Sequence, residues 1–155
     1  MMTATATRPT INCNASPFIP NQEEGWSIKS HRQFGQFEWD ASIFKTYLDE
    51  KQLEGRSIKG TELKVRLPYT KTLNANFLDF LLDFLKENPF EIPETFKPVG
   101  DAFYQCNIFW GTIYVNPHGR EFVRTLLVFK DGKCQGSYLP VDHGFGGCEM
   151  AIVLE

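Results

Sequence analysis

The sequence predicts an α+β fold in which an antiparallel sheet is covered by two helices. Three observations predict it. The last third of the chain is rich in the aromatic and β-branched residues that favour strands. Residues 61–67 alternate between apolar and charged side chains, as a half-buried strand does. Residues 73–87 carry apolar side chains around almost the whole circumference of a helix.

Length and composition indicate one ordinary domain. The chain has 155 residues, of which 42% are hydrophobic, and its formal net charge is −3. A chain of this length can bury a full hydrophobic core. We expect residues 1–25, rich in Thr, Ala, Asn and Pro, to form an N-terminal arm and residues 26–155 to form a single α+β domain. The sequence has neither a membrane-length apolar run nor a signal-like start, which predicts a cytoplasmic protein without membrane contact.

The first half of the domain contains two kinds of signal. Short apolar alternations between residues 26 and 39 predict one or two short strands. Residues 41–54 carry an apolar stripe at helical spacing after Asp40, which can serve as the N-cap, so a half-exposed helix is expected there. We expect the 61–67 strand next. The 73–87 helix follows and is expected to be the more buried of the two, because its polar stripe is narrow.

The C-terminal strands are predicted from their patterns and turns. A run from 102 to 115 is long enough to need a bend, which we expect near Gly111. Asp131-Gly132 is typical of a two-residue hairpin that would pair Phe129 with Cys134. The strand that ends the chain is expected to turn Cys148 inward. Together these segments predict a meander of about four antiparallel strands.

Histidine and cysteine residues suggest one chemical alternative. His118, Cys134, His143 and Cys148 are of the types that bind zinc, and His143 beside Cys134 or Cys148 could form a thiol nucleophile with its base. Their spacing fits no familiar zinc motif. We therefore expect no cofactor and no catalytic residue, and a small thiol- or zinc-dependent enzyme remains only an alternative.

Charge distribution suggests a second alternative. Residues 26–71 hold nine Lys and Arg residues against six Asp and Glu residues, although the whole chain is acidic. Basic and aromatic side chains alternate along this segment, which is what a single-stranded nucleic-acid surface needs. The residues predicted for such a surface, or for a protein-binding one, are Trp26, Arg32, Phe34, Trp39, Lys64 and Arg66.

Aromatic content leads to the favoured hypothesis. The chain has 14 Phe, five Tyr and three Trp residues, more than a single core of this size readily hides. Exposed aromatic residues are typical of protein interfaces. The sequence therefore predicts a non-catalytic binding protein that recognises a protein partner, or a second copy of itself in an oligomer, through an aromatic-rich surface and the N-terminal arm.

Overall fold

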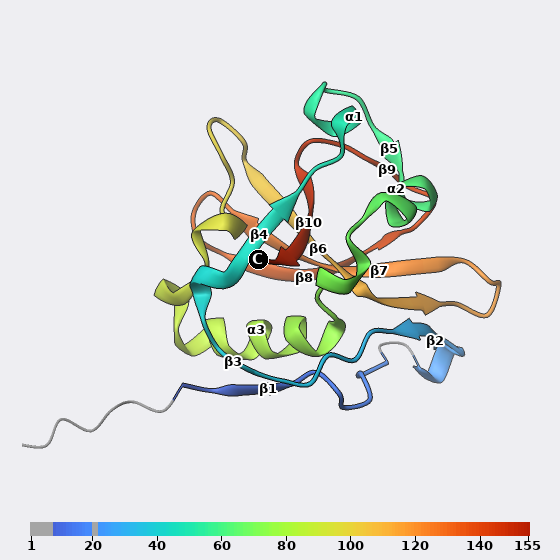
Figure 1. Cartoon of the computed structure of the whole chain (residues 1–155), viewed down its shortest axis with the longest axis horizontal. Coiled ribbons are helices and arrows are strands. Elements are labelled where there is room, and N and C mark those ends of the chain that lie inside the picture. Colours follow the sequence, from blue (N-terminus) through green and yellow to red (C-terminus); the bar gives the residue numbers. More distant parts are fainter. Residues whose placement is uncertain (1–7, 20–21) are drawn as a thin grey trace, which may run out of the picture.

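The computed structural model of the chain describes residues 8–19 and 22–155 (Figure 1). Its helices are α1 (Glu50–Leu53), α2 (Gly60–Arg66) and α3 (Ala75–Glu87). Its strands are β1 (Thr10–Asn12), β2 (Ser27–His31), β3 (Gln36–Glu38), β4 (Phe44–Tyr47), β5 (Ile58–Lys59), β6 (Tyr104–Val115), β7 (Glu121–Phe129), β8 (Cys134–Pro140), β9 (Gly144–Phe145) and β10 (Glu149–Leu154). The predicted α+β class is confirmed, and so are the short strands between residues 26 and 39.

A mostly antiparallel sheet lies at the centre of the described structure. Its strands lie in the order β4-β10-β6-β7-β8, and β2 also pairs with β6. The predicted meander is correct for β6, β7 and β8. It is wrong for β10, which crosses to the other side of β6 and runs parallel to it. Cys148 is consequently exposed at the start of β10 instead of facing inward.

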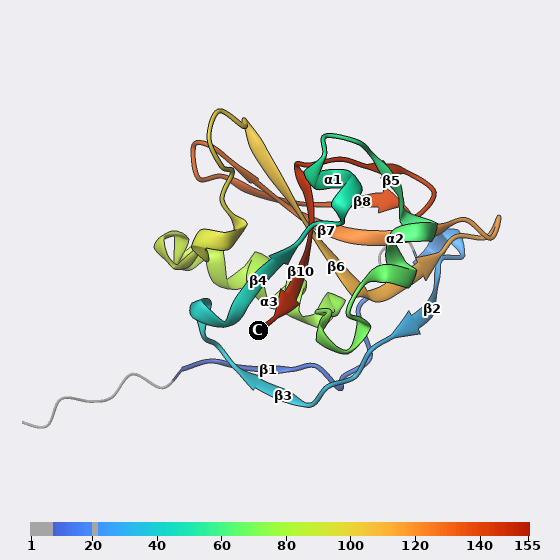
Figure 2. The same ribbon diagram turned by 45° about the horizontal axis from the view of Figure 1, so that its top comes forward.

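Both faces of the sheet are covered, as Figures 1 and 2 show. Helix α3 lies against one face, with the β1–β3 pair beyond it, and Phe77, Phe109 and Ile152 belong to the core between them. The α2 region and the β5–β9 pair lie against the opposite face, where Leu63 and Trp110 belong to a second core. Within the described residues, no helix is long and apolar enough to cross a membrane.

Helix α3 confirms the predicted buried helix. The Asn74 side chain caps it by accepting a hydrogen bond from the backbone N–H of Phe77 at 3.3 Å. Its polar stripe reaches into the sheet, because Asp79 accepts a 2.5 Å hydrogen bond from the Arg124 guanidinium, which is almost buried. An unpaired charge at that depth is costly, so the ion pair fixes the helix on β7.

The segment predicted as a strand at 61–67 is a helix instead, so that prediction is wrong. Leu63 and Leu67 are buried while Val65 between them is 80% exposed. Residues four apart lie on the same face of a helix, so the alternating pattern suits both structures. An ion pair between Glu62 and Arg66, also four apart, supports the helical form.

The helix predicted at 41–54 is also wrong. Asp40 does cap a turn, accepting a hydrogen bond from the backbone N–H of Ser42 at 2.9 Å, but that turn is short and β4 follows it. Strand β4 pairs with β10, with Phe44 opposite Leu154. Pairing along β10 outweighs the local helical pattern. A helix begins only at Glu50, after Asp49 closes a capping box with Gln52.

Two details of the C-terminal sheet refine the prediction. The expected irregularity near Gly111 is confirmed, because the register between β6 and β7 shifts between Phe109 and Tyr114. The β7–β8 hairpin is confirmed, but its register is wrong by one residue, because Cys134 pairs with Val128. Gly132 adopts a φ of 89° and lengthens the loop to three residues, as in a type I turn followed by a glycine bulge.

The described part of the N-terminal arm is tied to the domain. Strand β1 pairs with β3, and the Asn76 side chain donates hydrogen bonds to the carbonyls of Asn12 and Ala15 at 3.1 and 2.8 Å. The His31 ring also holds this segment: Nε2 lies 3.2 Å from the Ala15 carbonyl, and Nδ1 lies 2.8 Å from the Thr112 hydroxyl. The arm is therefore part of the fold at these residues.

The contacts of the His31 ring with Ala15 and Thr112 predict that the stability of the protein depends on pH. Burial lowers the pKa of His31 from its ordinary 6.5, and the hydrogen bond to Ala15 opposes this. As the pH falls, the unfolded chain takes up the proton first, so the folded state loses stability until its own lowered pKa is passed. We expect His31→Gln to reduce the fall in the free energy of unfolding between about pH 7.5 and about pH 5, measured by urea denaturation.

The same substitution at His118, which lies on an exposed loop, is the control and should keep the wild-type slope. If the free energy of unfolding of the His31→Gln protein fell with pH as steeply as that of the wild type, the proposed role of His31 would be wrong.

Candidate functional site

The aromatic residues predicted for binding do not lie on one surface. Trp39 is 5% exposed and packs against Phe44 and Phe84 in the core. Trp26 is half-buried and lies against the Phe122 ring, with 4.6 Å between ring centroids. Phe34 belongs to the periphery of the α3 core and lies beneath the Arg32 guanidinium at 4.6 Å. Arg32 itself donates a 2.7 Å hydrogen bond to the Thr72 carbonyl. These residues mainly stabilise the fold.

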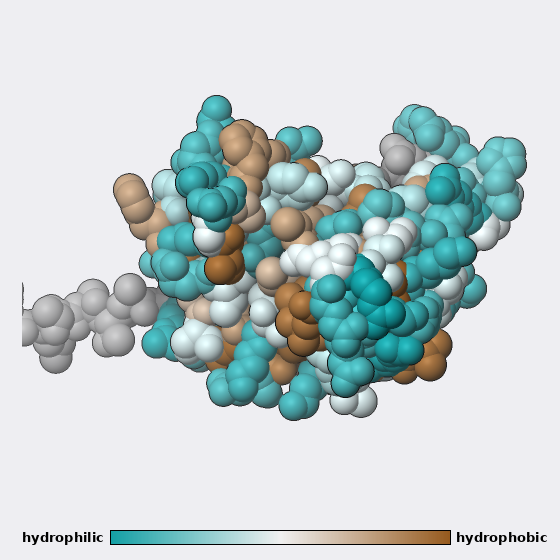
Figure 3. All heavy atoms as spheres, turned by 90° about the horizontal axis from the view of Figure 1, so that it is seen from above, coloured by the Kyte–Doolittle hydropathy of each residue, from teal (hydrophilic) through white to brown (hydrophobic). Residues whose placement is uncertain are grey.

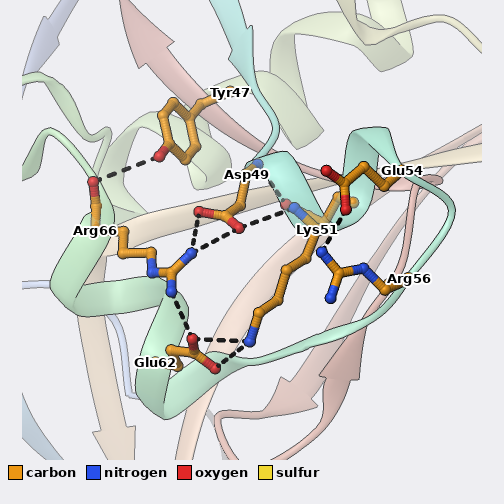
Figure 4. A network of polar contacts seen from close by, with 8 residues as sticks. Tyr47, Asp49, Lys51, Glu54, Arg56, Glu62 and Arg66 are labelled. Carbon is orange, nitrogen blue, oxygen red and sulfur yellow. Dashed lines mark hydrogen bonds and ion pairs between the residues drawn. The ribbon is translucent and has the colours of Figure 1, made fainter.

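The predicted basic residues on α2 are paired with carboxylates. Arg66 donates hydrogen bonds of 3.0 and 3.1 Å to Asp49 and one of 2.7 Å to Glu62, and Glu62 also binds Lys51 (Figure 4). The backbone N–H of Lys51, and next the Arg66 guanidinium, hold the pKa of Asp49 below its ordinary value. Lys64 lies 3.6 Å from Glu121. The network around Arg66 joins α1 to α2. Together with the Lys64–Glu121 pair, it neutralises the positive charge of Arg66 and Lys64 that was predicted to contact phosphates.

The histidine and cysteine residues predicted for chemistry form no metal-binding group in the described part of the chain. The His143 ring lies 3.0 Å from Glu149, and His118 is on the exposed β6–β7 loop. Cys134 lies at the start of β8, where burial raises the pKa of its thiol and so keeps it protonated at neutral pH. Among the residues that the structure describes, no group of three or more His, Cys, Asp or Glu side chains could hold a metal ion.

The β8 strand, by contrast, presents an unpaired backbone edge. It is the last strand of the sheet, next to β7 only. In an antiparallel ladder, alternate residues turn both backbone groups toward the partner strand. The Phe129 N–H donates a hydrogen bond to the Lys133 carbonyl, and the Val141 N–H donates one to the Glu121 carbonyl, each at 2.9 Å. Lys133 and Val141 therefore face β7, as does every second residue between them. This alternation directs the N–H and C=O groups of Cys134, Gly136 and Tyr138 outward.

These six outward groups, which we name the β8 edge, make no hydrogen bond to another residue in the described part of the chain. Natural edge strands are commonly protected by charged side chains or bulges. Residues 134–140 read Cys-Gln-Gly-Ser-Tyr-Leu-Pro and include no charged residue. Proline also protects edges, but Pro140 ends the strand and follows the six outward groups. The edge is therefore open to a further strand.

An aromatic hollow lies beside one end of the β8 edge. Exposed apolar residues are scattered on this molecule, and brown and tan atoms lie among teal ones in Figure 3. Phe103 and Tyr104, which are 73% and 41% exposed, are not scattered in this way, because both lie next to the Phe129 ring. The hollow has a volume of about 720 Å³ and is lined by Phe103, Phe129, Lys130, Asp131, Lys133, Cys134 and Gln135.

A second hollow lies on the other face of β8, between the strand and the end of α3. This helix-side hollow has a volume of about 530 Å³ and is lined from the helix side by Leu82, Leu85, Lys86, Pro89 and Ile92. From the strand side it is lined by residues 132–136. The same short stretch of β8 thus borders both hollows, one on each face of the sheet.

Gly136 brings the strand close to α3 at this point. A Cβ atom built on Gly136 would lie 3.1 Å from Leu82 Cδ1, which is tight but against the movable end of a side chain. A glycine inside a strand commonly marks a close approach of another backbone or ligand. Here it leaves the centre of the β8 edge without a side chain that would cover it.

Known proteins offer no comparison for this edge. No protein-family model, curated protein or solved structure matches the chain.

Sequence reasoning missed the β8 edge. Its signal is present, because seven uncharged residues follow the hairpin and end at Pro140. The same stretch would be unremarkable inside a sheet, where both of its edges would be paired. Only the strand order, which places β10 away from β8, leaves one edge free.

Proposed function

We propose that this protein is a non-catalytic binding protein that recognises a protein partner by strand addition at the β8 edge. The unpaired backbone groups of Cys134, Gly136 and Tyr138, flanked by a hollow on each face, carry the proposal. An extended segment that joins a sheet edge gains affinity from backbone hydrogen bonds and specificity from pockets for alternate side chains. The β8 edge offers both.

The aromatic hollow supports a protein partner in particular. Aromatic side chains are enriched at the buried centres of protein interfaces. Phe103 and Phe129, with ring centroids 6.4 Å apart, line the hollow that alternate side chains of an added strand would approach. The surface differs from the residue set predicted from the sequence, but the class of function is the one that the sequence favours.

His143, which the sequence offers as a catalytic base, is engaged in a structural contact, and this also favours a binding role. His143 is paired with Glu149, and Gln52 donates hydrogen bonds of 2.9 Å to the carbonyls of Gly146 and Glu149. This network fixes the turn before β10.

Gly136→Pro is expected to weaken partner binding at least about tenfold, because the substitution removes one outward N–H and places a ring in the path of the added strand. Its backbone N–H does not pair with β7, so the sheet itself keeps its ladder. The measurement selects peptides from a random phage-displayed library on the wild-type protein and then determines their affinity for both proteins by fluorescence anisotropy.

Gly136→Ala is the matched control, since it adds the same Cβ atom beside Leu82 but keeps the N–H. It should bind selected peptides within about threefold of the wild-type protein. Circular dichroism and thermal unfolding establish that both variants are folded. Equal affinity for Gly136→Pro and Gly136→Ala would exclude strand addition, and a failure to select any peptide would count against the proposal.

A further inference from the structure

We infer that the partner segment carries apolar side chains that point alternately into the two hollows, and that it ends in acidic residues on its C-terminal side, beside the lysines of the hollows. This inference rests on the proposed strand addition at β8. It concerns the chemistry of the partner and the direction in which its segment runs. Three observations carry it: the faces of the two hollows, their charge, and the composition of β8 itself.

Alternation follows from the positions of the hollows. Cys134 and Gly136 face α3, whereas Gln135 and Phe129 face the other side of the sheet. Residues of an added strand share a face with the residues directly opposite them. Alternate side chains of the partner would therefore enter the helix-side hollow, and those between them would approach the aromatic hollow. Both hollows have apolar floors, formed by Leu82 and Leu85 on one side and by the phenylalanines on the other.

The charge around the hollows is positive. Their linings include Lys86, Lys130 and Lys133 but a single acidic residue, Asp131. The whole chain, in contrast, has a net charge of −3. All three lysines are exposed, and the ion pair between Lys133 and Asp131 is long, at 3.8 Å. Exposed charges of one sign at an interface mainly select and attract partners of opposite sign.

Direction follows from where these lysines lie along the strand. Lys130 and Lys133 precede Cys134 and thus lie at the N-terminal end of β8. In antiparallel addition, the commoner pairing in sheets, the C-terminal end of the incoming segment lies beside that end. Acidic residues after the paired stretch would then reach the lysines. Acidic residues before it would lie near Pro140, away from them.

The composition of β8 favours a different protein over a second copy of this chain. Residues 134–140 contain no acidic residue that could approach the lysines. The next acidic residue along the chain, Asp142, pairs with Arg120 at 3.1 Å. Two copies joined edge to edge would leave the lysines without this complement. Pairing with a second copy of this chain is therefore disfavoured, and the experiment below distinguishes it from binding of another protein.

The test uses synthetic peptides of about ten residues that alternate valine and phenylalanine, so that both faces are apolar, with blocked termini. One carries two glutamates at its C-terminal end, one carries them at its N-terminal end, and one carries two lysines at its C-terminal end. We expect the first to bind at least about tenfold more tightly than the other two at low salt. Lys130→Gln/Lys133→Gln should remove most of that preference, and added salt should reduce it.

Each outcome has a distinct meaning. If all three peptides bind equally and Gly136→Pro still abolishes binding, the acidic preference is refuted while strand addition stands. If the N-terminal glutamates are preferred, the inferred antiparallel direction is overturned. If none binds and light scattering reveals a dimer that Gly136→Pro dissociates, the occupant is a second copy. If none binds but phage-selected peptides bind in a way that Gly136→Pro weakens, only the inference fails. If the selection also yields no peptide and the chain is monomeric, the proposed function fails with it.

Discussion

Phe77→Ala is expected to lower the free energy of unfolding by about 3–5 kcal/mol, the usual cost of removing a fully buried phenylalanine. Phe77 has no exposed surface. Its ring lies 5.3 Å from Phe44 and 6.0 Å from Phe37, between ring centroids. The substitution therefore leaves a cavity where α3, β3 and β4 meet. Urea denaturation followed by tryptophan fluorescence, to which buried Trp39 contributes, measures the loss.

Phe90→Ala is the matched control, because Phe90 is 99% exposed. It should change stability by no more than about 0.5 kcal/mol. Phe77→Leu is a milder variant that keeps much of the side-chain volume, and it serves if Phe77→Ala does not fold. We expect it to lower the free energy of unfolding by about 1–2 kcal/mol. A Phe77→Ala protein as stable as Phe90→Ala would contradict the packing of α3 on the sheet.

Gly111→Ala is expected to be the second large effect, with a loss of about 3 kcal/mol, toward the upper end for an overpacked core. The added Cβ would lie 2.6 Å from the Leu73 carbonyl oxygen and 2.8 Å from the Asn74 backbone nitrogen. These are backbone atoms at the start of α3, so they cannot turn aside as a side chain would. Gly111 N also donates a 2.8 Å hydrogen bond to the Leu73 carbonyl, which fixes the close approach.

The control for this variant is Gly147→Ala, where the nearest contact of a new Cβ is an ordinary 3.6 Å. Thermal and urea unfolding of the two proteins should differ clearly, with Gly147→Ala close to wild type. Similar stabilities would mean that the junction between β6 and α3 is looser than the distances indicate.

Several elements could be predicted because one local pattern suits only one structure. Residues 75–87 are apolar on too many sides for a strand of that length, and Asn88-Pro89 ends the helix. The Asp131-Gly132 pair indicates a turn wherever it occurs between strands. Even there, the register depended on the φ of Gly132, which sequence leaves open because glycine adopts either sign of φ.

Other segments were wrong because their pattern suits two structures. Leu63 and Leu67 lie on one face of a strand and also on one face of a helix, and contact with Val141 and Phe145 decides between the two forms. Residues 44–47 have helical spacing, yet β10 requires a hydrogen-bonding neighbour along its edge. In both cases a partner distant in the sequence supplied the deciding free energy.

The sequence by itself determined the α+β class, the buried helix and the hairpin, because these depend on side-chain periodicity and turn chemistry within a few residues. Tertiary structure alone decided that β8 became an edge of the sheet. That outcome depends on β10 inserting between β4 and β6, a pairing of residues more than forty positions apart. The candidate site could not be predicted because an unpaired backbone group has no signature in its own residue: it is unpaired only when no neighbour arrives.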